Sequence, residues 1–216
     1  MKTVISTPPD FYSLPKDIFS ALNKNKDPVP LSTSEISEIR LAKNRVNSDT
    51  VGLPKSIQTI LAIDKNFTLN NKYFKEPLFK PFFDQMDEKK IVHSARISDE
   101  LKRLFRGADL KGQDLLWNDI ESMPSLIELY SPGDQGVYMY MGEVDDNNEF
   151  PIARYDDQPE VWISASSIIQ YILSNTDVEN LIKIEEDFNT RLIEAKKRNE
   201  GFIKKEWWHE SFEFPV

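Results

Sequence analysis

The 216-residue sequence contains no cysteine, only two histidines and only seven glycines. Without cysteine there is no disulfide, no thiolate nucleophile and no zinc–cysteine site. His93 and His209 stand far apart with no ligand pattern around either, which disfavours a zinc site and suggests surface or packing histidines. The glycines form neither G-x-x-x-x-G-K nor G-x-G-x-x-G, the motifs of common nucleotide sites. We therefore expect neither a metal nor a cofactor.

Long apolar runs are also missing. No stretch approaches the roughly eighteen apolar residues of a membrane helix. The N-terminal residues MKTVISTPPD lack the apolar core of a secretory signal. Together with the lack of cysteine, these features predict a cytoplasmic protein with no membrane partner, and a hydrophobic content of 39% is typical of a folded chain.

Basic residues are scarce in one segment. Residues 121–187 contain 15 acidic residues but only two basic ones, Arg154 and Lys183, whereas residues 1–120 contain 19 basic and 16 acidic residues. Such a segment would repel nucleic acid and attract a basic protein. An acidic surface that serves only solubility is the simpler alternative.

The first half of the chain has helical signals. Residues 1–31 hold five prolines and predict an irregular arm with one helical turn at residues 17–22. Ser32 and Glu35 have the spacing of a capping box, and the apolar residues that follow predict a helix over residues 33–47. Pro54 opens a second helix. Residues 73–112 predict loops and short helices, one of them over residues 98–107.

The second half begins with strand signals. Residues 126–130, 137–141 and 151–155 are apolar or aromatic and are separated by turn-forming residues. Pro151 is most easily tolerated in an edge or bulged strand. A helix over residues 165–173 and a longer one from Thr176 follow, and the aromatic tail should dock because its large apolar side chains are costly to leave in water.

These patterns predict an α+β fold with a mainly antiparallel sheet packed by helices. The expected organisation is an arm over residues 1–31, one domain over residues 32–175, and a C-terminal helical extension with its tail over residues 176–216 packed on that domain.

The turns near the strands are unusually acidic. Asp145, Asn147 and Glu149 match the first alternating positions of a calcium loop, but Phe150 stands where glycine is required. A pair of carboxylates could also serve a hydrolase, although Asp in turns usually supports the backbone. The lack of compensating Lys or Arg favours a surface for a basic partner. The candidate partner-binding residues are Asp145, Asp146, Glu149, Asp156, Asp157 and Glu160, with Tyr138, Tyr140 and Tyr155 as aromatic contacts if any of them is exposed.

The segments VGLPKSIQTILAIDKNF and VWISASSIIQYIL, with the strands between them, resemble the SUKH superfamily. The matching features are the helix after Leu53 and Pro54, the turn at Gly133 and Asp134, the aromatic strand over residues 137–141, its hairpin partner, and Trp162 before the closing helix. The sequence departs from the family pattern at DKNFTLNN, where glycines are usual, and by about forty residues inserted before the strands.

The superfamily includes bacterial immunity proteins that neutralise polymorphic toxins and fungal regulators of cell-wall synthesis. The resemblance implies a non-catalytic immunity protein that binds a toxin domain, and a nuclease toxin would present basic residues to it. A regulatory or scaffold protein of the same fold is the alternative, and a carboxylate-based hydrolase is a third possibility.

Overall fold

The fold is seen in a computed structural model that describes residues 16–44, 49–71, 74–95, 125–131, 136–141, 144, 148–155, 161–165 and 167–175. The helix expected over residues 98–107 and the C-terminal extension from Thr176 lie outside these residues. The domain boundaries therefore stay a prediction.

Two short helices begin the described chain. Helix α1 (Lys16–Leu22) confirms the helical turn expected within the N-terminal arm, and it buries Phe19 and Leu22. Helix α2 (Thr33–Glu38) begins at the predicted capping box, where the Ser32 hydroxyl accepts the Glu35 N–H at 3.3 Å and the Glu35 carboxylate accepts the Ser32 N–H at 2.8 Å. However, α2 ends at Glu38, so the predicted helix over residues 33–47 is wrong beyond that residue.

Strand pairing replaces the rest of that helix. Ile39 is extended (φ −75°, ψ 131°), and the chain continues as β1 (Arg40–Ala42). Strand β1 pairs antiparallel with β2 (Thr50–Gly52) and parallel with β3 (Ile91–Val92), which gives the sheet order β2-β1-β3. This arrangement buries Leu41 completely between two partner strands. Because β3 comes some fifty residues later, the local apolar spacing around Leu41 carries no sign of it.

Prolines mark the next two helices. Helix α3 (Lys55–Leu61) follows Pro54, which takes the N-cap position, and the predicted apolar face of Ile57, Ile60 and Leu61 is fully buried. Helix α4 (Lys80–Asp84) has a proline in its first turn and lies where short helices and loops were expected. Strand β3, in the same region, was not predicted.

The second sheet confirms the three strands predicted between residues 126 and 155 and adds a fourth strand after them. Strands β4 (Leu126–Tyr130), β5 (Gly136–Tyr140), β6 (Ile152–Tyr155) and β7 (Val161–Ala165) pair antiparallel in the order β4-β5-β6-β7. All five residues of β5 are buried, as the apolar character of both its faces predicts.

Pro151 fits this sheet without occupying an edge. It immediately precedes β6, which lies between two partner strands, and its carbonyl oxygen accepts the Tyr140 N–H at 2.9 Å. The pairing of β6 with β7 is irregular between Ile152 and Ala153. The proline therefore adjoins a bulged region, one of the two settings that its missing N–H allows.

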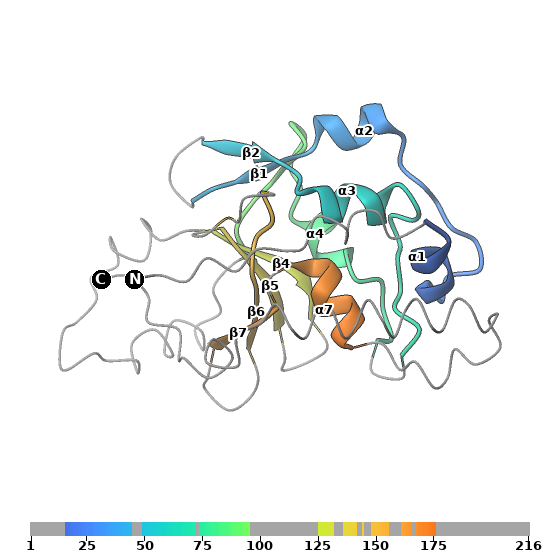
Figure 1. Cartoon of the computed structure of the whole chain (residues 1–216). Coiled ribbons are helices and arrows are strands. Elements are labelled where there is room, and N and C mark those ends of the chain that lie inside the picture. The colour runs from blue at the N-terminus through green and yellow to red at the C-terminus, as the bar shows by residue number, and fades with distance from the viewer. Residues whose placement is uncertain are drawn as a thin grey trace.

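Helix α7 (Ile168–Ser174) contacts both β7 and α3, while α4 packs on β4. In Figure 1 these helices lie close together, with the four-stranded sheet next to them. The buried side chains of both sheets and the helices form one hydrophobic core. The fold is thus α+β, and all but one of the strand pairs among the described residues are antiparallel. Within the described residues, no helix has the length and apolarity needed to cross a membrane.

Candidate functional site

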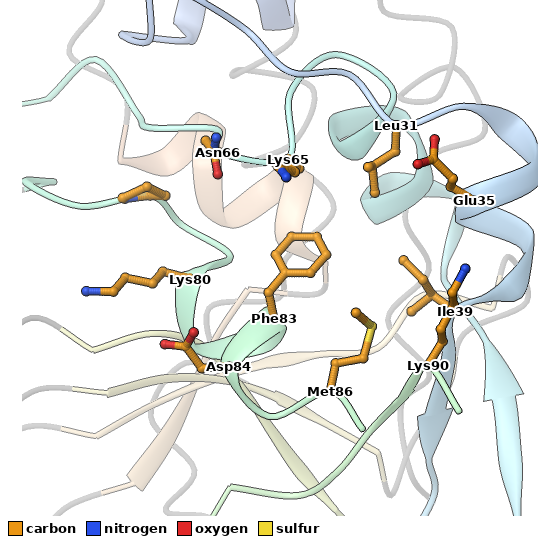
Figure 2. Close-up of a pocket in the computed structure, with 11 residues that line it drawn as sticks. Leu31, Glu35, Ile39, Lys65, Asn66, Lys80, Phe83, Asp84, Met86 and Lys90 are labelled. Atoms are coloured by element: carbon orange, nitrogen blue, oxygen red, sulfur yellow. The ribbon is translucent and has the colours of Figure 1, made fainter. Parts of the chain in front are cut away.

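A pocket of about 520 Å³ opens beside α2, α4 and the loop after α3 (Figure 2). This volume is typical of sites for small molecules, roughly 300 to 1,000 Å³. Its apolar lining comes from Leu31, Ile39, Pro77, Phe83 and Met86. Its polar lining comes from Glu35, Lys65, Asn66, Lys80, Asp84 and Lys90. The pocket is therefore amphipathic, with several charged groups around an apolar floor.

The loop after α3 is held by a buried carboxylate. Asp64 Oδ2 accepts hydrogen bonds from the side-chain amides of Asn23 and Asn25, each at 2.8 Å. Its Oδ1 accepts the backbone N–H groups of Val29 at 3.0 Å and Asn66 at 2.9 Å. Burial raises the pKa of Asp64, but these hydrogen bonds outweigh it, and the pKa lies below its ordinary value of 3.8. Asp64 therefore stays ionised and ties residues 23–29 to its own loop.

The same loop positions one wall of the pocket. The Lys65 N–H donates to the Val29 carbonyl at 2.9 Å, and the Leu31 N–H donates to the Leu61 carbonyl at 2.9 Å. These bonds join residues 29–31 to residues 61–65, so Leu31 and Lys65 reach the pocket from a backbone that is fixed on both sides.

The three lysines of the pocket differ in their partners. Lys80 forms an ion pair with Glu76 at 2.9 Å, and Lys90 forms one with Glu38. The Glu76 carboxylate raises the pKa of Lys80. The Lys65 ammonium has no ion pair with any other described residue. Within this part of the chain, Lys65 thus differs from the other two pocket lysines, whose charges are paired.

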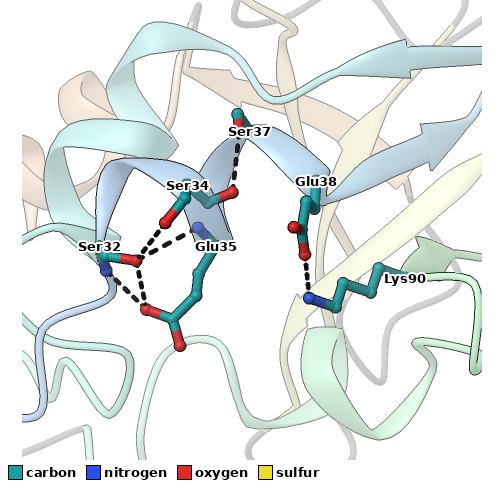
Figure 3. A network of polar contacts seen from close by, with 6 residues as sticks. All are labelled: Ser32, Ser34, Glu35, Ser37, Glu38 and Lys90. Carbon is teal, nitrogen blue, oxygen red and sulfur yellow. Dashed lines mark hydrogen bonds and ion pairs between the residues drawn. The ribbon is translucent and has the colours of Figure 1, made fainter.

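A polar network forms the rim on the side of α2 (Figure 3). The Ser32 hydroxyl donates to Glu35 Oε2 at 2.6 Å, in addition to the two bonds of the capping box. The Ser32 side chain and backbone lower the pKa of Glu35 below its ordinary value of 4.5, and the positive charges of Lys90 and Lys65 add to this effect. Glu35 therefore lacks the raised pKa of a general acid.

The carboxylates of the pocket do not form a close pair. In Figure 2, Glu35 and Asp84 lie on opposite sides of the pocket, and Asp84 belongs to α4. No group of three or more His, Asp or Glu residues in the described part of the chain is arranged to hold a metal ion. The Asp64 cluster is equally unsuited to a cation, because four N–H groups already donate to its carboxylate.

The predicted acidic site requires one clear correction. Glu149 is not on the surface: it is 1% exposed. Its Oε1 accepts the Ser56 N–H at 2.9 Å, and its Oε2 accepts a hydrogen bond from the Ser56 hydroxyl. Ser56 lies in the first turn of α3, whose N-cap is a proline without a capping side chain. Glu149 caps this helix from a distant part of the chain, which explains its burial.

Two of the predicted aromatic contacts are also internal. Tyr138 and Tyr140 are 8% and 4% exposed, so neither offers a free ring to a partner. Tyr155 is in β6, but its side chain is outside the described residues, as are the whole of Asp145, Asp146, Asp156, Asp157 and Glu160. The structure therefore does not bring the predicted site residues together on one described surface.

No pattern in the sequence predicted this pocket. Its residues are spread from Leu31 to Lys90 and follow no fixed spacing, and of them only Glu35 belonged to a predicted motif, the helix cap that it forms with Ser32. These residues form a pocket because α2, α4 and the loop after α3 that contains Asp64, the Asp64 loop, meet in space.

The chain matches a family of known proteins over most of its length. Residues 14–213 match a family described as Domain of unknown function (DUF5066). The chain is also similar to a solved crystal structure of an uncharacterized protein from Salmonella enterica subsp. enterica serovar typhimurium str. 14028s, with 26% identity, a TM-score of 0.60, and coverage of 89% of this chain and 94% of that chain. No curated protein matches it. Because the family match spans most of its length, the chain belongs to the DUF5066 family.

Proposed function

We propose that this chain acts by binding a basic protein, as an immunity-type inhibitor of a toxin domain, and not by catalysis. The observation that carries the proposal is the segregation of charge, with 15 acidic and two basic residues in residues 121–187. A toxin that cuts nucleic acid presents lysines and arginines to phosphates, and clustered carboxylates can occupy those positions instead. The resemblance to the SUKH superfamily supports the same interpretation, and so does the α+β fold.

Burial narrows the set of residues that would make this contact. Glu149, Tyr138 and Tyr140 are removed from it because they are inside the protein. The remaining carboxylates form two groups in the sequence: Asp145 and Asp146 precede β6, and Asp156, Asp157 and Glu160 follow it. We therefore treat the two groups as separate parts of the proposed contact.

Charge reversal tests the proposal. In cells that express the toxin encoded beside this chain, the wild type should restore growth. We expect Asp145→Lys with Asp146→Lys, or Asp156→Lys with Asp157→Lys and Glu160→Lys, to abolish rescue by repelling the basic partner. The measurement is survival together with co-purification of the toxin at increasing salt.

The matched control, Asp27→Lys with Glu88→Lys, reverses the charge of two exposed acidic residues outside residues 121–187. It should restore growth as well as the wild type does. Full rescue by both test variants would remove the acidic segment from the mechanism. Loss of rescue in the control as well would show that overall charge matters and not a specific surface.

A further inference from the structure

We propose that the amphipathic pocket binds a small organic acid, with an aromatic or branched aliphatic body and a single carboxylate. This inference is independent of the proposed function, because no pocket residue belongs to the acidic segment. In this proposal, the carboxylate of the ligand contacts Lys65 and Asn66, and its apolar body packs on the pocket floor, which Phe83 and Met86 form.

Lys65 and Asn66 form a pair of donors on one wall. Both are half-buried, and Figure 2 shows them next to each other above the Phe83 ring. Neither the Lys65 ammonium nor the Asn66 carboxamide has a hydrogen-bond partner among the described residues. Their backbone is held by Asp64 and Val29, so a ligand would meet them already positioned.

The apolar floor fits a carbon body of limited size. Phe83 and Met86 are only partly buried although they pack against the core, so both keep surface available to a ligand. Leu31 and Ile39 add apolar surface to the right of the Phe83 ring in Figure 2. A pocket of about 520 Å³ has room for one or two rings beside these side chains.

Both acidic groups of the pocket have partners of their own, although the Glu35 carboxylate also interacts with the Lys65 charge. The Glu35 carboxylate is directed to Ser32, which donates to it from both its hydroxyl and its N–H. Asp84 is exposed and lies on the side of Lys80, whose positive charge it faces. Lys90 and Lys80 have acidic partners, so Lys65 is the pocket lysine without an ion pair among the residues that the structure describes.

Binding can be tested with a matched pair of probes, 2-naphthylacetate and the uncharged 2-(2-naphthyl)ethanol. Methyl NMR of the full chain would report the Met86, Leu31 and Ile39 signals during titration. We expect the acid to shift these methyl signals and to bind about three- to tenfold more tightly than the alcohol, as one partly exposed charge contact implies. Lys65→Met should reduce the affinity for the acid to that for the alcohol.

The control Lys26→Met removes an exposed charge outside the pocket and should leave both affinities unchanged. Phe83→Leu should lower the affinities for both probes to a similar extent, because it changes only the apolar floor of the pocket. Equal binding of the two probes to the wild type, an unchanged affinity in Lys65→Met, or methyl shifts outside the pocket would each overturn the proposal. Lys65 is half-buried, and its ammonium forms no ion pair with another described residue, so Lys65→Met tests the proposal even if Phe83→Leu fails to fold.

Discussion

At the scale of single residues, the buried carboxylate of Asp64 makes the sharpest prediction. All four of its partners donate hydrogen bonds, whereas an asparagine offers one acceptor oxygen and turns an NH₂ group toward donors. We expect Asp64→Asn to lower the free energy of unfolding at neutral pH by about 2–4 kcal/mol. Urea unfolding measures this change, and Asp27→Asn, at an exposed position in the stretch that Asp64 contacts, is the control.

The pH dependence follows from the lowered pKa of Asp64. A carboxyl group with a lower pKa in the folded than in the unfolded state stabilises the fold above its unfolded pKa. That stability is lost as the pH falls below the ordinary value of 3.8 and through the folded pKa. The stability difference between the wild type and Asp64→Asn should therefore shrink as the pH falls in this range. A difference that stays constant down to acid unfolding would contradict the assigned role.

At the scale of elements, helix α3 depends on a residue far away in sequence. Pro54 provides no side-chain cap, and Glu149 accepts the Ser56 N–H and hydroxyl instead. Replacing Glu149 with Ala leaves these donors buried without that acceptor, so we expect a loss of about 2–4 kcal/mol in unfolding free energy. The exposed Glu88→Ala should have almost no effect. An equally small effect of Glu149→Ala in thermal and urea unfolding would show that α3 does not need this cap.

At the scale of the whole molecule, the two sheets should differ in local stability. Strand β5 is buried along its whole length between two partner strands, while β2 is a three-residue edge strand of half-buried residues. Local opening needs less free energy where few buried contacts are lost. We expect amides of β5 to exchange with solvent at least about 100-fold more slowly than those of β2, measured by hydrogen exchange and NMR. Equal protection of both strands would mean that the sheets open together.

The sequence alone determined those features in which the signal is local. Ser32 and Glu35 are three residues apart and cap α2 as predicted, and Ile57, Ile60 and Leu61 form a buried helix face. The strands β4, β5 and β6 were recognisable because apolar runs alternate with turn-forming residues. In these cases, the residues that interact are neighbours in the chain or in a hairpin.

The tertiary structure decided what depends on distant partners. The chain leaves the helix after Glu38 because β1 is paired by β2 and β3, whose two or three residues are too short to give a periodic pattern. Glu149 belongs to an acidic stretch in the sequence, yet it is buried because Ser56, 93 residues away, meets it at the start of α3. The pocket likewise exists only where α2, α4 and the Asp64 loop meet. Each outcome is set by which segments meet in space, and such long-range contacts leave no local pattern.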